Sequence, residues 1–178
     1  MEPAYTARRG SVATPAERER LALSAERTCV HATPPERKMR TALGHLGFKT
    51  TPQKAEGPFN IDLAAFPVAV EVIGPSWGQP NTRLLARHPR RTRYLLDRGW
   101  SLIFVRDGRG LPKPWTAAAK YVVALADRLR REPALRGQYR VIRSNGKELV
   151  RGCMKDDQFP VITPLRPELS IRCTHEDV

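Results

Sequence analysis

The sequence predicts an α/β domain in which a mixed central β-sheet is flanked by helices. Two apolar stretches, residues 59–64 and 68–73, have the length and the alternation of short strands. A third apolar stretch, residues 100–105, follows a basic helical segment and is typical of a strand that is buried on both faces. A strand, a helix and a strand that returns in parallel form an α/β crossover, and this pattern gives the fold class.

The composition predicts a polyanionic partner. In this chain of 178 residues, 31 Lys and Arg against 18 Asp and Glu give a formal net charge of +13. That excess favours nucleic acid, with an anionic membrane surface as a distant alternative. Because the sequence has no apolar run of about 18 residues and no apolar signal core, we expect no membrane span and a cytoplasmic, nucleoid-associated protein. Three cysteines, Cys29, Cys153 and Cys173, lack metal-ligand spacing, which argues against zinc.

Two capping boxes predict the first two helices. After a loose tail, Thr14 and Glu17 open a charged helix that runs to about Arg27, and its thin apolar stripe suggests a packing arm or a DNA-contacting appendage. Thr33 and Glu36 open a second, more amphipathic helix that stops near Gly47. Residues 49–58 are polar, and we expect a loop there.

The remaining elements follow from proline, glycine and periodicity. Because proline can begin a helix but interrupts its interior, we expect the basic helix to run from Pro89 to about Arg98. Residues 117–131 predict another amphipathic helix. Asn145 and Gly146 predict a tight turn between strands at 138–142 and 148–151, a hairpin that either extends the sheet or forms a small appendage.

The chain therefore divides into three predicted parts. Residues 1–32 form a basic tail and helical arm, residues 33–131 the core, and residues 132–178 a C-terminal hairpin with an extended, partly ordered tail.

Two acids on adjacent predicted strands are the main candidates for chemistry. Period-two alternation places Asp62 opposite in face to Ile61, and Glu71 opposite in face to Val70, so that both acids project to the same side. Like charges gathered in this way need a counter-charge. A divalent cation such as Mg²⁺ suits oxygen ligands and can bind a substrate phosphate.

The order of these parts resembles the very-short-patch-repair endonuclease group of the PD-(D/E)XK nuclease superfamily, which also includes phage homing endonucleases with an EDxHD motif. The resemblance covers roughly residues 33–105. Its motifs are Thr33-x-x-Glu36, Ile61-Asp62, Val70-Glu71-Val72-x-Gly74 with Trp77 after it, a basic helix, and Leu95-x-x-x-Gly99-Trp100. It implies a restriction-endonuclease-like core, in which Asp62, Glu71 and the main-chain carbonyl of Val72 hold Mg²⁺ or Mn²⁺ and Glu36 reaches toward the active site.

Other side chains complete the predicted site. Gln53 or His88 would orient or deprotonate the attacking water. The predicted nucleic-acid contacts are Trp77, Arg83, Arg87, Arg90, Arg91 and Arg93. Simpler roles stay open: Glu36 as a capping residue, Asp62 as a strand-end or surface ion-pair residue, His88 as a phosphate or solvent contact, and Trp77 as a lid over the core.

Departures from the family pattern keep a second function open. Ile73 stands where the superfamily usually has a lysine, Gly78 where the repair enzymes have a histidine, and Thr92 where relatives have an aspartate. Val70-Glu71-Val72-x-Gly74-Pro75 and the Arg-rich helix also resemble the RAP domain, a nuclease-like module of organellar RNA-binding proteins. We therefore expect a metal-dependent endonuclease acting on DNA more readily than on RNA, as a monomer or homodimer. The alternatives are a catalytically inactive nucleic-acid-binding module and a basic structural protein on ribosomal RNA.

Overall fold

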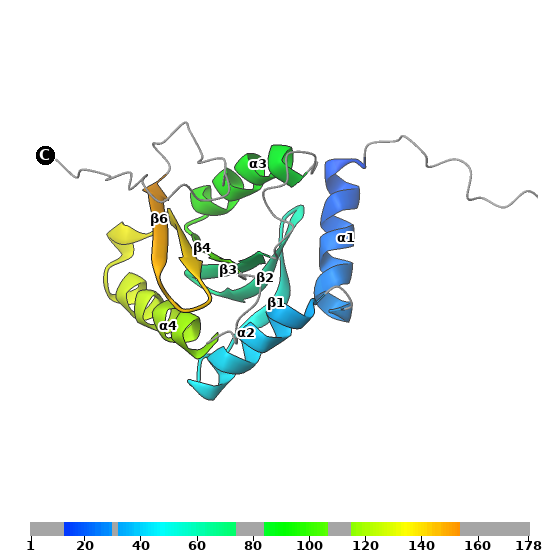
Figure 1. Ribbon diagram of the computed structural model, residues 1–178. Coiled ribbons are helices and arrows are strands. Elements are labelled where there is room, and N and C mark those ends of the chain that lie inside the picture. Colours follow the sequence, from blue (N-terminus) through cyan, green and yellow to red (C-terminus); the bar gives the residue numbers. More distant parts are fainter. Residues whose placement is uncertain (1–12, 30–31, 74–83, 107–114, 154–178) are drawn as a thin grey trace, which may run out of the picture.

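The computed structural model is a mixed six-stranded sheet with helices on both faces (Figure 1). It describes residues 13–29, 32–73, 84–106 and 115–153, with the backbone alone at 84–88, 150 and 153. The helices are α1 (Pro15–Thr28), α2 (Pro34–His45), α3 (Leu84–Asp97) and α4 (Trp115–Arg131), with a 3-10 turn at Pro133–Leu135. The strands are β1 (Thr51–Glu56), β2 (Phe59–Ala65), β3 (Val68–Ile73), β4 (Ser101–Arg106), β5 (Gln138–Arg143) and β6 (Glu148–Cys153).

The strands lie in the sheet in the order of the chain. β1, β2 and β3 form an antiparallel meander, β3, β4 and β5 run parallel, and β6 folds back on β5 as an antiparallel edge. Helices α3 and α4 make the two connections between the parallel strands. The predicted α/β class with a mixed sheet is therefore confirmed, and the C-terminal hairpin extends the sheet.

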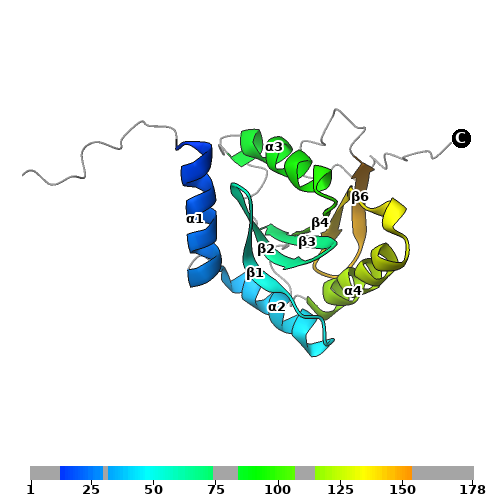
Figure 2. The ribbon, with the colours of Figure 1, turned by 180° about the vertical axis from the view of Figure 1, so that it is seen from behind.

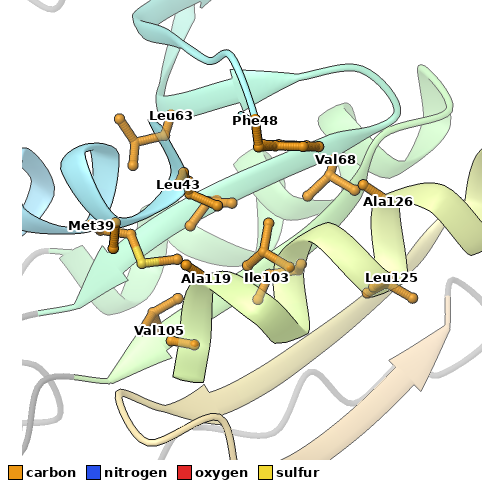
Figure 3. Close-up of a cluster of buried hydrophobic side chains, with 14 of the residues drawn as sticks. Met39, Leu43, Phe48, Leu63, Val68, Ile103, Val105, Ala119, Leu125 and Ala126 are labelled. Atoms are coloured by element: carbon orange, nitrogen blue, oxygen red, sulfur yellow. The ribbon is translucent and has the colours of Figure 1, made fainter. Parts of the chain in front are cut away.

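One face of the sheet packs against α2 and α4 (Figure 3). Met39 and Leu43, one turn apart on α2, lie against Leu63 of β2 and Ile103 of β4. On α4 the buried positions recur every three or four residues, which gives the helix one continuous apolar side. This layer is the larger part of the core.

The other face of the sheet packs against α3, as the reverse view shows (Figure 2). Leu95 and Leu96 are buried there against Leu102 and Phe104 of β4. Near the β1–β2 turn the ring of Tyr94 stands edge-on to Phe59, with 5.2 Å between their centroids. α3 is thus anchored at its C-terminal half, and Arg91, one turn before Leu95, reaches Asn60 of β2 and Glu71 of β3.

The N-terminal helix is docked on the edge of the sheet. Ala22 is buried, and its carbonyl accepts a hydrogen bond from the Asn60 side chain at 2.8 Å. The Glu26 carboxylate accepts the Ala55 N–H at 2.8 Å and lies 3.2 Å from Lys54 Nζ. Of the two predicted roles, packing is the one that the structure shows for α1. Among the described residues, each helix is too short or too polar to cross a membrane.

Two predicted boundaries were wrong. Residues 49–58 are not a loop, because Thr51–Glu56 forms the edge strand β1, whose buried positions Gln53 and Ala55 include a polar residue that hides the alternation. The basic helix begins at Leu84 rather than at Pro89. Pro89 lies just past the first turn, where it removes one backbone hydrogen bond without ending the helix.

Glycine at position 57 should be required for the β1–β2 turn. Gly57 has φ +54°, and an added Cβ would overlap the hydroxyl end of Tyr94. We expect Gly57→Ala to lower the free energy of unfolding by about 2 kcal/mol, because strain and overpacking add. Urea denaturation measures the change. The control is Gly44→Ala in α2, where nothing lies within 4 Å and a gain of about 0.5–1 kcal/mol is expected. Equal effects of the two changes would contradict this account.

Candidate active site

The two predicted acids face each other across neighbouring strands. β2 and β3 pair Leu63 with Val70, so the antiparallel register continued by one residue places Asp62 opposite Glu71. The N–H of Val72 donates to Asp62 Oδ2 at 2.9 Å, and the N–H of Asp62 hydrogen-bonds to the Glu71 carboxyl. Main-chain donors therefore hold both carboxyls in place where the strand pairing ends.

A third acid and an amide approach from the other side. Glu36 is buried in the first turn of α2. Its carboxylate accepts one hydrogen bond from Thr33 Oγ1 at 2.7 Å and another from Gln53 Nε2 at 2.9 Å. Gln53 lies on β1 with φ +48°, an unusual conformation for a residue with a side chain, and its carbonyl accepts the Asn60 amide at 2.8 Å. Strain of this kind is often found at functional sites.

Charge also connects Glu36 with the acid pair. Its negative charge raises the pKa of both Asp62 and Glu71. Four predicted catalytic residues, Glu36, Gln53, Asp62 and Glu71, thus come from three different strands and a helix to one place. Glu36 thus bonds to the side chain of Thr33, the N-cap residue of α2, and also lies close enough to act on the acid pair through its charge.

Arg91 of α3 supplies the positive charge. Its guanidinium Nη2 lies 2.5 Å from Glu71 Oε1, and the same nitrogen donates to the Asn60 carbonyl. The side chains are 17% and 7% exposed, respectively. Sequence reasoning placed Arg91 among the nucleic-acid contacts, whereas in the structure its guanidinium points inward to the acids.

The pKa shifts show which charges dominate. Burial, and then the charge of Glu71, raise the pKa of Asp62 well above its usual value, and Arg91 only partly offsets them. Burial also raises the pKa of Glu71, despite the ion pair with Arg91. Burial opposes the charge on Arg91, but Glu71 and Asp62 outweigh it and raise the arginine pKa. A single arginine therefore does not neutralise the carboxylates around it.

A metal ion at the acid pair would need ligands from outside the protein. Within the described ranges, no group of three or more His, Cys, Asp or Glu side chains is arranged to hold a metal. Mg²⁺, however, is often bound by one or two carboxylates while substrate and water supply its other ligands. Among the described residues the Asp62 carboxylate accepts only the Val72 N–H and forms no ion pair, so it retains acceptor capacity. Asp62, Glu71 and the Val72 carbonyl are compatible with such a site.

The other predicted site residues are only partly placed. Arg90 is exposed on α3, as is Arg93 one turn from Arg90. His88 and Arg87 belong to the same helix, but only their backbone is described. Trp77 and Arg83 lie outside the described residues. The structure therefore places two of the predicted basic contacts on the outside of α3.

Sequence reasoning missed the roles of Asn60 and Arg91. Asn60 links three elements, because its amide donates to Ala22 and Gln53 and its carbonyl accepts Arg91. Alternation gave no reliable signal for Asn60, because β2 is irregular around Asp62: Ile61 is buried under α3 and Leu63 under α2 and α4. For Arg91 no local signal separates a buried arginine from five neighbours of the same charge. Comparisons with family models, with curated proteins and with solved structures find no match for this chain.

Removing Arg91 should leave a buried carboxylate without its counter-charge. We expect Arg91→Met to lower the free energy of unfolding at pH 7 by about 3 kcal/mol or more. The loss should shrink as the pH is lowered, because burial already raises the pKa of Glu71, the loss of Arg91 raises it further, and a protonated carboxyl needs no counter-charge. Adding Glu71→Gln should restore much of the stability. Denaturation at pH 7 and over a series of lower pH values measures these effects. Arg90→Met, an exposed neighbour, should change stability by less than about 0.5 kcal/mol, and a similar loss for both variants would contradict the role of the pair.

Neutralising Asp62 should instead stabilise the protein. The pKa of Asp62 is raised in the folded state, so the folded protein binds this proton more tightly than the unfolded chain does. Stability is then lost as pH rises from the unfolded value of about 3.9 through the folded pKa. Asp62→Asn keeps an oxygen for the Val72 N–H and removes the charge. We expect a higher melting temperature at pH 7 and a smaller fall in stability between pH 4 and pH 8, both measurable by thermal denaturation; an unchanged pH profile would contradict the shift.

Proposed function

We propose that this protein is a metal-dependent endonuclease that hydrolyses phosphodiester bonds of nucleic acid, DNA more readily than RNA. The observation that carries the proposal is the pairing of Asp62 and Glu71 beside Arg91, with Glu36 close enough for its charge to raise the pKa of both acids. Fully ionised, these groups hold three negative charges against one positive charge. A divalent cation that binds there would relieve the repulsion that raises the pKa of Asp62.

Each residue then has a distinct part. Asp62, Glu71 and the Val72 carbonyl would hold Mg²⁺ or Mn²⁺, which when bound neutralises charge on the phosphate and lowers the pKa of a water. Glu36 fixes the amide of Gln53 by the 2.9 Å bond, so that Gln53 is oriented rather than free to rotate. Gln53 can position a water through its oxygen, and Glu36 can accept a proton. His88 remains a further proposed proton acceptor.

The basic surface supports a nucleic-acid substrate. Arg90 and Arg93 are exposed on the helix whose inward residue, Arg91, contacts the acid pair. Together with a net charge of +13, they favour contact with phosphates close to the site. Phosphate contacts position a nucleic acid without reading its sequence, so the target sequence is not specified by them.

A second candidate function is a nucleic-acid-binding module without catalysis. The observation that favours it is the 2.5 Å ion pair between Arg91 and Glu71, because it engages an oxygen that a metal would need. Ile73, where the related nucleases have a lysine, is buried in the apolar layer under α3. In this alternative the acids would organise α3, and the exposed arginines would bind the ligand.

Cleavage assays separate the two functions. We expect supercoiled plasmid to be nicked or cut in Mg²⁺ or Mn²⁺ and not in EDTA. Asp62→Asn should lower the rate by at least about 100-fold, because the metal contributes several kcal/mol to the transition state. A structured RNA, tested in the same way, should be the poorer substrate.

Controls make the assay specific. Asp97→Asn removes an exposed aspartate from the C-terminal end of α3 and should leave cleavage unchanged. Binding of DNA in EDTA should survive in Asp62→Asn. Tight, salt-sensitive binding by the wild type with no cleavage in either metal would reject the endonuclease and support the binding module.

A further inference from the structure

Two arginines lie side by side at the C-terminal ends of the parallel strands. Arg106 ends β4 and Arg143 ends β5, and the parallel pairing makes them direct Cα partners. Neighbouring strands are about 4.8 Å apart, and like charges directly opposite each other destabilise a sheet. The arrangement therefore costs stability unless an anion binds between them.

These arginines share a sheet face with the acid pair. Glu71 is the Cα partner of Phe104, and Phe104 is the partner of Val141. Phe104 and Val141 are buried in the layer under α3. Because side chains alternate along a strand, the residues two positions further on, Arg106 and Arg143, lie on this same face. The two arginines are thus on the side of the sheet from which Arg91 reaches Glu71.

Within the described part of the chain, no acid neutralises this pair. Neither guanidinium has an ion pair or a side-chain hydrogen bond among residues 13–29, 32–73, 84–106 and 115–153. Arg106 is half-buried and Arg143 exposed. Burial, followed by the charge of Arg143, lowers the pKa of Arg106, which is the direction expected for a cation that lacks a counter-ion. Arg140, three residues before Arg143, differs in this respect, since it is paired with Glu148 at 3.0 Å.

We propose that Arg106 and Arg143 form a phosphate-binding site that holds a backbone phosphodiester of the nucleic acid beside the acid pair. Two adjacent guanidinium groups offer several donors to one phosphate, which arginine matches in geometry better than lysine does. The inference rests on the proposed function only in taking nucleic acid as the partner.

Distance supports a joint role with Asp62 and Glu71. Arg106 is two residues further along the sheet than Glu71 and one strand away, so their Cα atoms are about 8 Å apart by strand geometry. That separation allows one strand of nucleic acid to contact the arginines while a neighbouring phosphate reaches the acids. The exposed Arg90 and Arg93 on α3 would then border the same path.

The salt dependence of binding tests this site without cleavage. DNA binding to the full chain is measured in EDTA over a range of NaCl concentrations, for the wild type, Arg106→Gln, Arg143→Gln and the double variant. Each lost phosphate contact should reduce the slope of log affinity against log salt by about 0.7–0.9. If both arginines bind the same phosphate, the slope in the double variant should be reduced little more than in either single variant.

The matched control is Arg131→Gln. Arg131 is an exposed arginine at the C-terminal end of α4, which leads into the start of β5 and so lies at the opposite end of the parallel strands. Its removal changes the net charge equally and should leave the slope unchanged. Arg143→Gln should also melt no lower than the wild type, because it relieves repulsion with Arg106.

Each outcome decides the inference. A reduced slope in Arg106→Gln and Arg143→Gln, with the control unchanged, supports the site even if no cleavage is found, in which case only the endonuclease proposal fails. Equal slopes in all variants overturn it, even if plasmid is cleaved. Inorganic phosphate is the second probe. The melting temperature is compared in phosphate and in chloride at equal ionic strength. If phosphate raises it, and Arg106→Gln abolishes that rise but keeps the wild-type DNA slope, the arginines form a free-anion site and the nucleic-acid assignment is overturned.

Discussion

The buried ion pair between Arg91 and Glu71 is the constraint on which the α3 side of the molecule depends. The surrounding layer is apolar, with Ile73, Leu95 and Phe104 around it, and such a layer does not hold an isolated carboxylate. Because Arg91 comes from α3, neutralising Glu71 also docks the helix on the sheet. The second bond of Arg91, to the Asn60 carbonyl, ties the same helix to β2. The same side chain, Arg91, therefore neutralises Glu71 and fixes the position of α3 on the sheet.

This ion pair explains Glu71 but not Asp62. A structural pair needs one acid and one base, yet Asp62 adds a second carboxylate whose pKa is raised by burial and by Glu71. Glu36, in the first turn of α2, adds a third negative charge nearby, although Thr33 already caps that helix. Proteins keep such costly groups mainly where they serve a function, since the same positions filled by neutral residues would be more stable. The excess of acid over base is thus the strongest physical reason to expect a cation at this place.

Local sequence patterns predicted the parts that depend on local physics. Alternation in β2 and β3 placed Asp62 and Glu71 on one side, and the capping box placed Glu36 at the start of α2. In the structure Asp62 lies opposite Glu71, Glu36 lies in the first turn of α2, and the Asn145–Gly146 hairpin is present. The alternation itself fails at Ile61, which is buried in the layer under α3, whereas Leu63 is buried under α2 and α4. β1 was missed because its inward residue Gln53 is polar. Gln53 is buried because its side chain bonds to Glu36, and only the tertiary structure brings these two residues together. The inward direction of Arg91 was missed for the same reason, since its partner is 20 residues away.

The two ends of this sheet face carry opposite charges, and that contrast connects the proposals. Asp62 and Glu71 are negative at β2 and β3, while Arg106 and Arg143 are positive at β4 and β5. A phosphodiester held by the arginines would be repelled by the acids unless a cation lies between them, because the Cα atoms of Glu71 and Arg106 are only about 8 Å apart. With a divalent ion bound, the same acids attract the phosphate through the metal. The arginine pair alone is suited to binding a nucleic acid. Hydrolysis would need the arginine pair, the acids and a cation together. Metal binding at Asp62 is therefore the property that separates a nuclease from a protein that only binds nucleic acid.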